Sequence, residues 1–541
     1  MGISVTRARG LLRIFQIILV TAVSLLLALA IALPMLERSW VTAEEHLAPK
    51  DAFFRGSIGT ELIPLPVLQV LPDLFPEDFG AGDTWIDRFG FLRSSDPDGL
   101  PVGFTVSHHR PQSGAPSPVP FVGFSCVLCH STRIRDTGNQ AEQIVPGPGN
   151  SSLNLFAWID SLQKAMMDER LTVKTISDTY VKKPGRQPLT VSQRAMIGLW
   201  LRGFRKTLSE GLPKFDEPFG GDLSLTPECV PTGPDRTQPF RTIVRRVLDR
   251  PGTEMSVYTK VATVYQEQLR EWSQFDGSIR DLNARSALAA FAAGATADNL
   301  AIPEIAGNVR QASEYTRTLR GPTYEQIFPE RSLDAEKVRR GKVIYTGAGL
   351  DASVGVSGKH VKLTCDACHG HPENGVWIAG ELQGVVIPWE QIKTDPERVT
   401  YRYYERIPDR LAVFFPANHP FEFKRGDLRP GPAGTTRGYI NAPIDSAFSR
   451  TPYLHNASVL TLAELINLKP RRAVVYRGRN SYDPVDVGLS SPDGPDAVHY
   501  FRLDTSLRGN SNKGHDYPWP YGSPKWNRGQ LEDLLEYLKT L

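Results

Sequence analysis

The sequence has few cysteines, little net charge and no methionine in its C-terminal half. Four of the five cysteines form two pairs spaced by two residues and Cys229 stands alone, so no set remains for a structural disulfide framework. We expect Cys229 to be a buried or idle thiol rather than a catalytic one. The 62 basic and 59 acidic residues give a formal charge of only +3, which gives no reason to expect nucleic acid as a partner.

The length and composition indicate a globular chain with more than one core. A chain of 541 residues is too long for a single hydrophobic core and predicts two or three domains. The 46 glycines and 43 prolines predict long connections between short regular elements.

A long apolar run lies near the N-terminus. Residues 14–36 contain no charged side chain, and as a helix these 23 residues would span about 34 Å, enough for a bilayer core of ~30 Å. Arg7, Arg9 and Arg13 precede the run, so residues 1–13 are expected to stay in the cytoplasm. We predict a transmembrane signal anchor in the inner membrane, with the bulk of the chain in the periplasm. Secretion after cleavage is the alternative, because small residues at 28, 30 and 32 fit signal-peptidase sites.

Each cysteine pair is followed directly by a histidine, in the pattern C-x-x-C-H. The two units are Cys126, Cys129 and His130 in "FSCVLCHS", and Cys365, Cys368 and His369 in "LTCDACHG". Such a unit suits zinc binding, dithiol redox chemistry or haem attachment. A structural zinc site takes four ligands, whereas each unit offers at most three and the two lie far apart in the chain. A dithiol centre does not require the histidine.

Haem of the c type accounts for all three residues of each unit. The two thiols add to the two vinyl groups, and the histidine binds the iron. Export agrees with this interpretation, because bacteria assemble such haems outside the inner membrane. We therefore predict two covalently bound c-type haems, each with its iron, as the cofactors.

With two haems, the predicted fold is mainly α, with two cytochrome c-like haem domains and long irregular loops after one N-terminal transmembrane helix. The first domain is expected over residues 37–322 and the second over residues 323–541. The polar segment 316–334, broken by glycine and proline, is expected to link them.

Two helices are expected to cross in the second domain. The first begins after Ser332 as a cap and contains Gly341, which allows close approach. The second ends the chain, with five leucines on one face and a capping box of Asn527 and Gln530 at its start.

Further motifs surround the two units. They are "LPVGFT" at 100–105, "FVGFSCVLCHS" at 121–131, "RTPYLHNASVLTLAELI" at 450–466, "SYDPVDVGL" at 481–489 and "DTSLRGNSNKGH" at 504–515. Together they resemble the di-haem cytochrome c peroxidase superfamily, and within it the di-haem branch that includes the bacterial rubber oxygenases. Residues 170–300 match only vaguely.

The resemblance implies a division of labour between the two haems. The haem of His130, the implied catalytic residue, would have an open face for a small-molecule oxidant, either peroxide or O2. The haem of His369 would be six-coordinate and would exchange electrons with a donor or acceptor protein. One position departs from the peroxidases: Leu454 in "PYLHNA" stands where they have a methionine ligand, and a hydrocarbon side chain cannot bind iron.

The second haem therefore needs another distal ligand. Met255 is the last methionine, so the second domain has no thioether, and a histidine is the expected replacement. We predict His515 in "GNSNKGHDY", because the histidine of this motif has that role in the rubber-oxygenase-like relatives and its glycines permit a tight turn. His455 is the alternative, and His499 a more distant one.

Other polar residues have two interpretations each. His108 and His109 could reach the distal side of the first haem, or form a solvated pair on a loop. Arg450 and the arginines at 471, 472, 477 and 479 could contact haem propionates, or form a solvated basic surface.

The leading functional prediction is a membrane-anchored, extracytoplasmic di-haem oxidoreductase. One open haem would react with peroxide or O2, and the other would transfer electrons. The alternative is a pure electron-transfer protein with no substrate. A structural or sensory haem protein is a third, weaker interpretation.

Overall fold

The computed structural model describes most of the chain beyond residue 46. The described residues are Thr21, 47–95, 99–136, 142–209, 232–237, 243, 247, 257–347, 353–356, 359–362, 364–400, 407–429, 436–478, 481–492, 497, 500–516 and 526–541.

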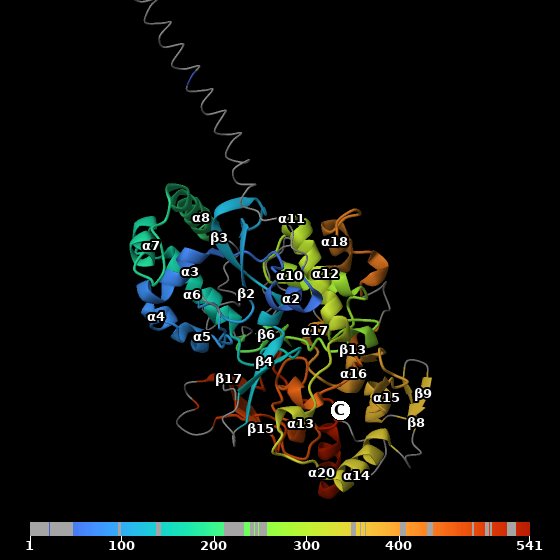
Figure 1. Ribbon diagram of the computed structural model, residues 1–541. Helices are drawn as coiled ribbons and strands as arrows, with labels where there is room; N and C mark the ends of the chain where they lie inside the picture. Colours follow the sequence, from blue (N-terminus) through green and yellow to red (C-terminus); the bar gives the residue numbers. More distant parts are fainter. Residues whose placement is uncertain are drawn as a thin grey trace, which may run out of the picture.

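Before residue 323, groups of helices are separated by groups of strands (Figure 1). The helices are α2 (Pro49–Arg55), α3 (Leu65–Leu74), α4 (Pro76–Phe79), α5 (Thr84–Arg88), α6 (Leu155–Met167), α7 (Val173–Tyr180), α8 (Val191–Ser209), α10 (Leu282–Ala292), α11 (Ala297–Leu300) and α12 (Pro303–Thr318), with 3-10 turns η1 (Cys126–Leu128) and η2 (Glu267–Leu269). The strands are β1 (Ile63–Pro64), β2 (Phe104–His109), β3 (Pro116–Phe124), β4 (Ser131–Asp136), β5 (Glu142–Pro146), β6 (Arg236–Thr237) and β7 (Thr259–Lys260).

The remainder of the chain has the same mixed character. Its helices are α13 (Tyr324–Ile327), α14 (Ala335–Thr346), α15 (Cys365–His369), α16 (Trp389–Ile392), α17 (Glu397–Thr400), α18 (Ile407–Phe414), α19 (Leu462–Leu465) and α20 (Arg528–Leu538), with 3-10 turns η4 (Arg425–Asp427) and η5 (Ala447–Arg450). Its strands are β8 (Ser353–Val356), β9 (Lys359–Lys362), β10 (His371–Glu373), β11 (Val376–Ile378), β12 (Val386–Pro388), β13 (Gly438–Ile440), β14 (Val474–Arg477), β15 (Ser481–Asp483), β16 (Gly488–Leu489) and β17 (Phe501–Asp504).

The strands form several small sheets. In the order β1-β3-β2, strand β3 is antiparallel to both neighbours. A four-stranded sheet has the order β16-β15-β4-β5, and its β4–β15 pair is parallel, with Ser481 opposite Arg135. The other described strands form two-stranded pairs. The strand that follows the first C-x-x-C-H unit is thus held by a strand from the C-terminal part of the chain.

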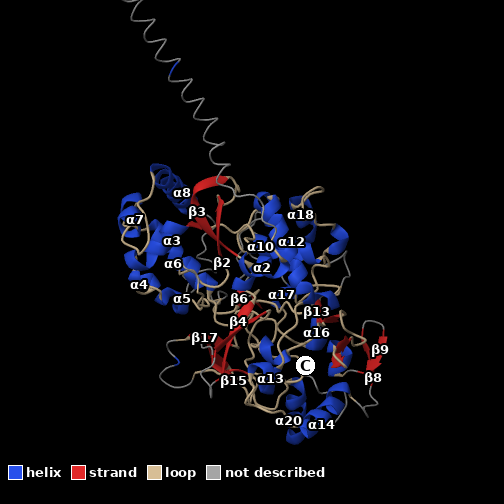
Figure 2. Ribbon diagram, in the orientation of Figure 1, coloured by secondary structure: helices blue, strands red, loops and turns tan. Residues whose placement is uncertain are grey.

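The described structure is a mixed α/β fold, so the predicted mainly α class is wrong (Figure 2). Strand β3 shows why. Pro116, Pro118 and Pro120 exclude a helix there, because proline removes a backbone donor and clashes with the preceding turn. The side chains between and after them, from Ser117 to Phe121, are buried in alternation, which is the period of a strand.

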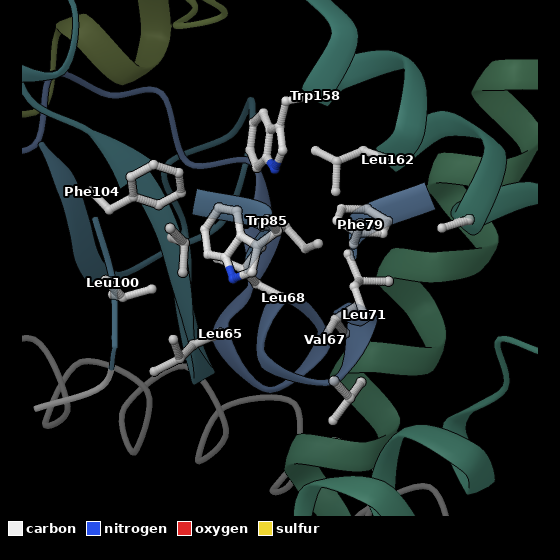
Figure 3. Packing of buried hydrophobic residues seen from close by; sticks show 14 of the residues in the cluster. Leu65, Val67, Leu68, Leu71, Phe79, Trp85, Leu100, Phe104, Trp158 and Leu162 are labelled. Carbon is white, nitrogen blue, oxygen red and sulfur yellow. The ribbon is translucent and has the colours of Figure 1, made fainter. Parts of the chain in front are cut away.

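An aromatic core supports the strands that lead to the first unit (Figure 3). The Phe104 ring lies edge-on to Trp85 at 5.9 Å and to Trp158 at 5.8 Å between centroids. Phe104 also contacts Phe124, the last residue of β3, at 5.4 Å. Such edge-to-face pairs add to the free energy gained by burying the rings. The end of β3, which directly precedes the first unit, is therefore well packed.

The two helices expected to cross do pack against each other (Figure 1). A Cβ on Gly341 of α14 would lie 2.0 Å from the Asp533 carbonyl oxygen of α20, so only glycine fits this crossing. Asn527 and Gln530 form the expected capping box. The cap of α14, however, is Asp334 and not Ser332.

The hydrophobic clusters cross the predicted domain boundary. Ile134 and Val145 lie in one cluster with Tyr345 and Leu534 of the C-terminal part. The boundary between residues 322 and 323 stays a prediction, and the packing joins the chain on its two sides.

The predicted signal anchor, residues 14–36, lies outside the described residues except for Thr21. In the described part of the chain, no helix has the length and apolar character needed to cross a membrane. The described helices therefore give no support to the predicted transmembrane helix or to an inner-membrane anchor, and these two expectations are corrected.

Candidate functional site

The first C-x-x-C-H unit forms a tight turn directly after β3. The backbone N–H of His130 donates to the Cys126 carbonyl at 3.0 Å, and Ser125 Oγ donates to the Phe54 carbonyl at 2.9 Å. Gly103 packs against the turn with φ +85°, where a Cβ would lie 2.4 Å from the Leu128 backbone. The turn is therefore held closely on two sides.

The His130 ring is fixed by a distant segment. Its Nδ1 lies 2.9 Å from the Ala262 carbonyl oxygen, and a carbonyl can only accept, so Nδ1 carries the proton. Nε2 is then the nitrogen free to bind a metal. Burial lowers the pKa of His130 to about 3, with a smaller contribution from Arg285, so the ring is neutral.

The second unit is a short helix, α15, capped by Thr364, whose side chain accepts from the Ala367 N–H at 3.0 Å. The His369 ring repeats the arrangement of the first unit, because its Nδ1 lies 2.8 Å from the Ala442 carbonyl oxygen. Tyr345 Oη donates to the Gly370 carbonyl at 2.6 Å, which ties α15 to α14. Both units thus present a neutral imidazole held through Nδ1.

Beside the second unit lies a cavity of about 270 Å³. Cys365, Cys368 and His369 line it, and its apolar walls include Ile387, Ile440 and Leu465. A mostly apolar cavity with a few polar groups is the usual form of a small-molecule or cofactor site.

His515 faces His369 across this cavity. The two ring centroids are 6.1 Å apart, with the planes inclined by 39°. His515 has φ +51°, and its N–H donates to the Ile392 carbonyl at 2.8 Å. Gly514, at φ +79°, lies so close to the backbone of Lys393 and Thr394 that a Cβ would meet it at 2.2 Å. The glycine thus allows the chain to bring His515 to this position.

The alternative histidine has another partner. His455 also lines the cavity, but its ring stacks on Tyr439 at 4.4 Å, and its Nε2 lies 3.1 Å from the Tyr439 hydroxyl. Burial lowers the pKa of His455 to about 3. His499, the third candidate, lies outside the described residues. Leu454 lines the cavity and offers no donor to a metal.

All four thiols are unbridged and lie in surroundings that favour the neutral form. Burial raises the pKa of Cys126 to about 11 and that of Cys129 to about 12. Burial likewise raises the pKa of Cys365 and of Cys368 to about 12. Reactive dithiol centres have lowered thiol pKa values, so these surroundings disfavour dithiol exchange.

The segment around Ala262 touches both units. Its carbonyl holds His130, while Ala262 itself lines the cavity beside His369. The buried Arg285 also lines that cavity and pairs with Glu267, and its charge contributes to lowering the pKa of His130. One short segment therefore lies beside both C-x-x-C-H units. Neither motif predicts this proximity.

The remaining candidates have structural roles. His108 Nδ1 bonds to the Ser117 carbonyl at 2.9 Å, and His109 bonds to Glu304 at 3.0 Å. Arg477 is fully buried and donates to the Ala457 carbonyl, while Arg471 donates to carbonyls of the His515 loop, including Gly514 at 2.8 Å. Arg471 and Arg477 thus stabilise the fold through hydrogen bonds to backbone carbonyls. Cys229 and Arg479 lie outside the described residues.

No group of three or more His, Cys, Asp or Glu side chains in the described part of the chain is arranged to hold a metal ion. The described side chains thus give no support to the predicted metal-binding character, and the haem iron expected from the sequence stays a prediction.

Sequence reasoning missed three cations of the cavity wall: Lys260, Arg270 and Arg285. They lie in the region whose sequence matched only vaguely, and no local motif marks them. Arg450, which was considered for propionates, does line the cavity.

Comparison with known proteins gives a different grouping from the one expected. Residues 50–130 match the model of the Y4iN-like domain, a segment that ends on His130. The chain is 25% identical over 533 residues to "Uncharacterized protein y4iJ" of Sinorhizobium fredii, with 84% of each chain covered. It is also 31% identical over 121 residues to "Uncharacterized protein y4iM" of the same organism, covering 19% of this chain and 27% of that protein. The family that matches is described as Y4iN-like, and not as a cytochrome or a haem peroxidase family, so the expected resemblance to the di-haem peroxidase superfamily, and the peroxidase-like classification, are wrong.

Proposed function

We propose that the chain binds two haems covalently, one at Cys126, Cys129 and His130 and one at Cys365, Cys368 and His369, and acts as a redox protein. The observation that carries this proposal is the pair of facing imidazoles, His369 and His515, beside two half-buried thiols at the wall of one cavity.

The spacing of the two rings fits one metal ion between them. Imidazoles bound to opposite sides of an ion have centres roughly 6 Å apart, since each metal–nitrogen bond is about 2 Å long and each nitrogen lies about 1 Å from its ring centre. The measured distance is 6.1 Å. A haem supplies four nitrogen ligands of its own, so two histidines complete its coordination and no larger cluster of side chains is needed.

The side chains have distinct roles in this proposal. The thiols of each unit would form thioether bonds to the vinyl groups, and neutral thiols with raised pKa values suit a permanent link rather than exchange. The carbonyls of Ala262 and Ala442 hold His130 and His369 in the tautomer that points Nε2 away from the hydrogen bond. A bound haem would supply a one-electron iron centre and, where a coordination position is open, a place for peroxide or O2 to bind.

The two units differ in the second imidazole. His515 lies opposite His369, which supports a closed site for electron transfer with a donor or acceptor protein. In the described residues no second histidine ring lies against His130, and His109 is bonded to Glu304 instead. This difference supports an open site at His130 for a small oxidant. The alternative is a pure electron-transfer protein with both sites closed.

Intact mass and optical spectra test the proposal. The purified protein should exceed its polypeptide mass by two haem groups, and either double variant, Cys126→Ala with Cys129→Ala or Cys365→Ala with Cys368→Ala, should lose one. A high-spin band that shifts with cyanide would support the open site, and its absence would favour the pure electron carrier. Haem that dissociates into acidified organic solvent, or a mass without any increment, would reject covalent attachment.

A further inference from the structure

A half-buried arginine on the cavity wall has two of its three guanidinium nitrogens without a hydrogen-bond partner among the described residues. Arg270 follows η2 and lines the cavity beside the second unit. Its Nη1 donates to the Thr263 carbonyl at 3.3 Å, whereas Nε and Nη2 are both buried and have no partner among the described residues.

These two nitrogens lie on the same edge of the guanidinium group. That edge presents two parallel N–H donors, and it matches the two oxygens of a carboxylate in a bidentate pair. The vacant donors therefore have the geometry of a carboxylate receptor.

The neighbouring carboxylates are already paired. Glu267 Oε2 accepts from Arg285 and also from Thr316 Oγ1 at 2.7 Å. Asp445 pairs with Arg450 and accepts from Gln266 Nε2 at 3.1 Å. Neither side chain hydrogen-bonds to the open edge of Arg270.

The side chains that line the cavity also carry an excess of positive charge. The residues that line the described cavity include four cations, Lys260, Arg270, Arg285 and Arg450, and one carboxylate, Glu267. Glu267 pairs with Arg285, and Asp445 behind the wall pairs with Arg450, so Lys260 and Arg270 are the two wall cations without a bonded carboxylate among the described residues. Lys260 is satisfied by the carbonyls of Arg450 and Pro452, at 2.5 and 2.6 Å, which add no negative charge. A buried cation without an anion is costly, so this wall favours a negatively charged occupant.

We infer that the cavity contains a carboxylate-binding site, in which Arg270 receives the carboxylate through Nε and Nη2. The occupant has an apolar body, because Ile387, Ile440 and Leu465 form the rest of the wall. Two sources carry this chemistry: the propionate side groups of a haem attached at the second unit, or a free organic acid. The first source rests on the proposed function and the second does not.

Benzoate is the probe, with benzamide as its neutral isostere, titrated by calorimetry into two full-length proteins. One is the chain as purified, and the other carries Cys365→Ala and Cys368→Ala so that no ring is attached at the cavity. Arg270→Gln removes the receptor, and Arg270→Lys keeps the charge but loses the two-donor edge. Arg280→Gln is the matched control, because Arg280 forms an exposed pair with Glu271 at 3.0 Å.

The cysteine double variant should bind one benzoate per chain and no benzamide. Arg270→Gln should weaken benzoate binding at least tenfold and Arg270→Lys by less, with Arg280→Gln unchanged. If propionates occupy the site, the purified chain binds no benzoate, and Arg270→Gln lowers the reduction potential of one haem because a positive charge is lost. If a free acid is the occupant, the purified chain binds benzoate as the double variant does.

The inference is overturned if neither protein binds benzoate through Arg270 and the potentials of both haems are unchanged in Arg270→Gln. Equal binding of benzamide would also overturn it. If the double variant does not fold, the purified chain decides alone, by benzoate binding or by the potential. A chain whose mass lacks haem but which binds benzoate through Arg270 would refute the proposed function and leave this site intact.

Discussion

His369 and His515, distant in the chain, face each other across one cavity with 6.1 Å between their ring centroids. His369 is oriented by the Ala442 carbonyl, and His515 is placed by a backbone bond to Ile392. Each histidine is thus positioned by its own hydrogen bond, and the distance between the two rings does not depend on a contact between them.

Replacing His515 tests the pairing of the two rings. In haem-loaded protein, His515→Ala should convert one haem from low spin to high spin, because one axial imidazole is lost. His455→Ala is the matched control, since His455 lines the same cavity but stacks on Tyr439. Electron paramagnetic resonance of both variants distinguishes the roles. An unchanged low-spin signal in His515→Ala would reject the assignment and direct attention to His455.

Gly514 should be sensitive to a single methyl group. Gly514→Ala places a Cβ 2.2 Å from the backbone of Lys393 and Thr394 at φ +79°. We expect a loss of at least about 2 kcal/mol in the free energy of unfolding. Gly384→Ala has the same φ of +79° but no atom within 4 Å of the added Cβ, so it should cost only about 1 kcal/mol. Equal losses in urea denaturation would contradict the close contact.

The crossing of α14 and α20 makes a second packing prediction. Gly341→Ala would bring a Cβ to 2.0 Å from the Asp533 carbonyl oxygen, and we expect a destabilisation of about 3 kcal/mol. Gly307→Ala in α12 has no atom within 4 Å of the new Cβ and should be neutral or stabilising by about 0.5–1 kcal/mol. Denaturant unfolding followed by circular dichroism compares the two, and a stable Gly341→Ala protein would contradict the tight crossing.

The His109–Glu304 pair predicts a pH-dependent contribution to stability. The hydrogen bond that His109 Nε2 donates to Glu304 is the main cause that raises the pKa of His109, partly opposed by burial. Because the folded pKa lies above the unfolded value of about 6.5, the pair stabilises the protein fully below that pH. Its contribution is lost as the pH rises through the folded pKa.

Glu304→Gln therefore should lower the free energy of unfolding at pH 5.5 more than at pH 8.5. Glu314→Gln, which removes an exposed pair with Arg317, is the control and should show no such difference. A pH-independent effect of Glu304→Gln would show that His109 keeps its ordinary pKa.

Several expectations from the sequence failed because they depended on more than local pattern. The prolines of β3 already exclude a helix there by local rules. The mainly α prediction overlooked them, because it assigned a cytochrome c-like fold to the whole chain from the two C-x-x-C-H units. The family expectation relied on scattered motifs, whereas the segment matched by a family model ends on His130. The cap of α14 moved by two residues to Asp334, because both Ser332 and Asp334 satisfy the same local preference.

The sequence by itself determined the chemistry that acts over a few residues. The spacing of Cys365, Cys368 and His369 places two thiols and an imidazole on one turn of chain, and Asn527 and Gln530 cap a helix through bonds three residues apart. Only the tertiary structure decided which histidine faces His369 and which arginine lacks an anion. His515 and His455 are equivalent as ligand types, and packing against Tyr439 engages one while Gly514 places the other at the cavity. Arg270 is open because Glu267 and Asp445 bond to other residues, a competition among groups distant in sequence that no local pattern encodes.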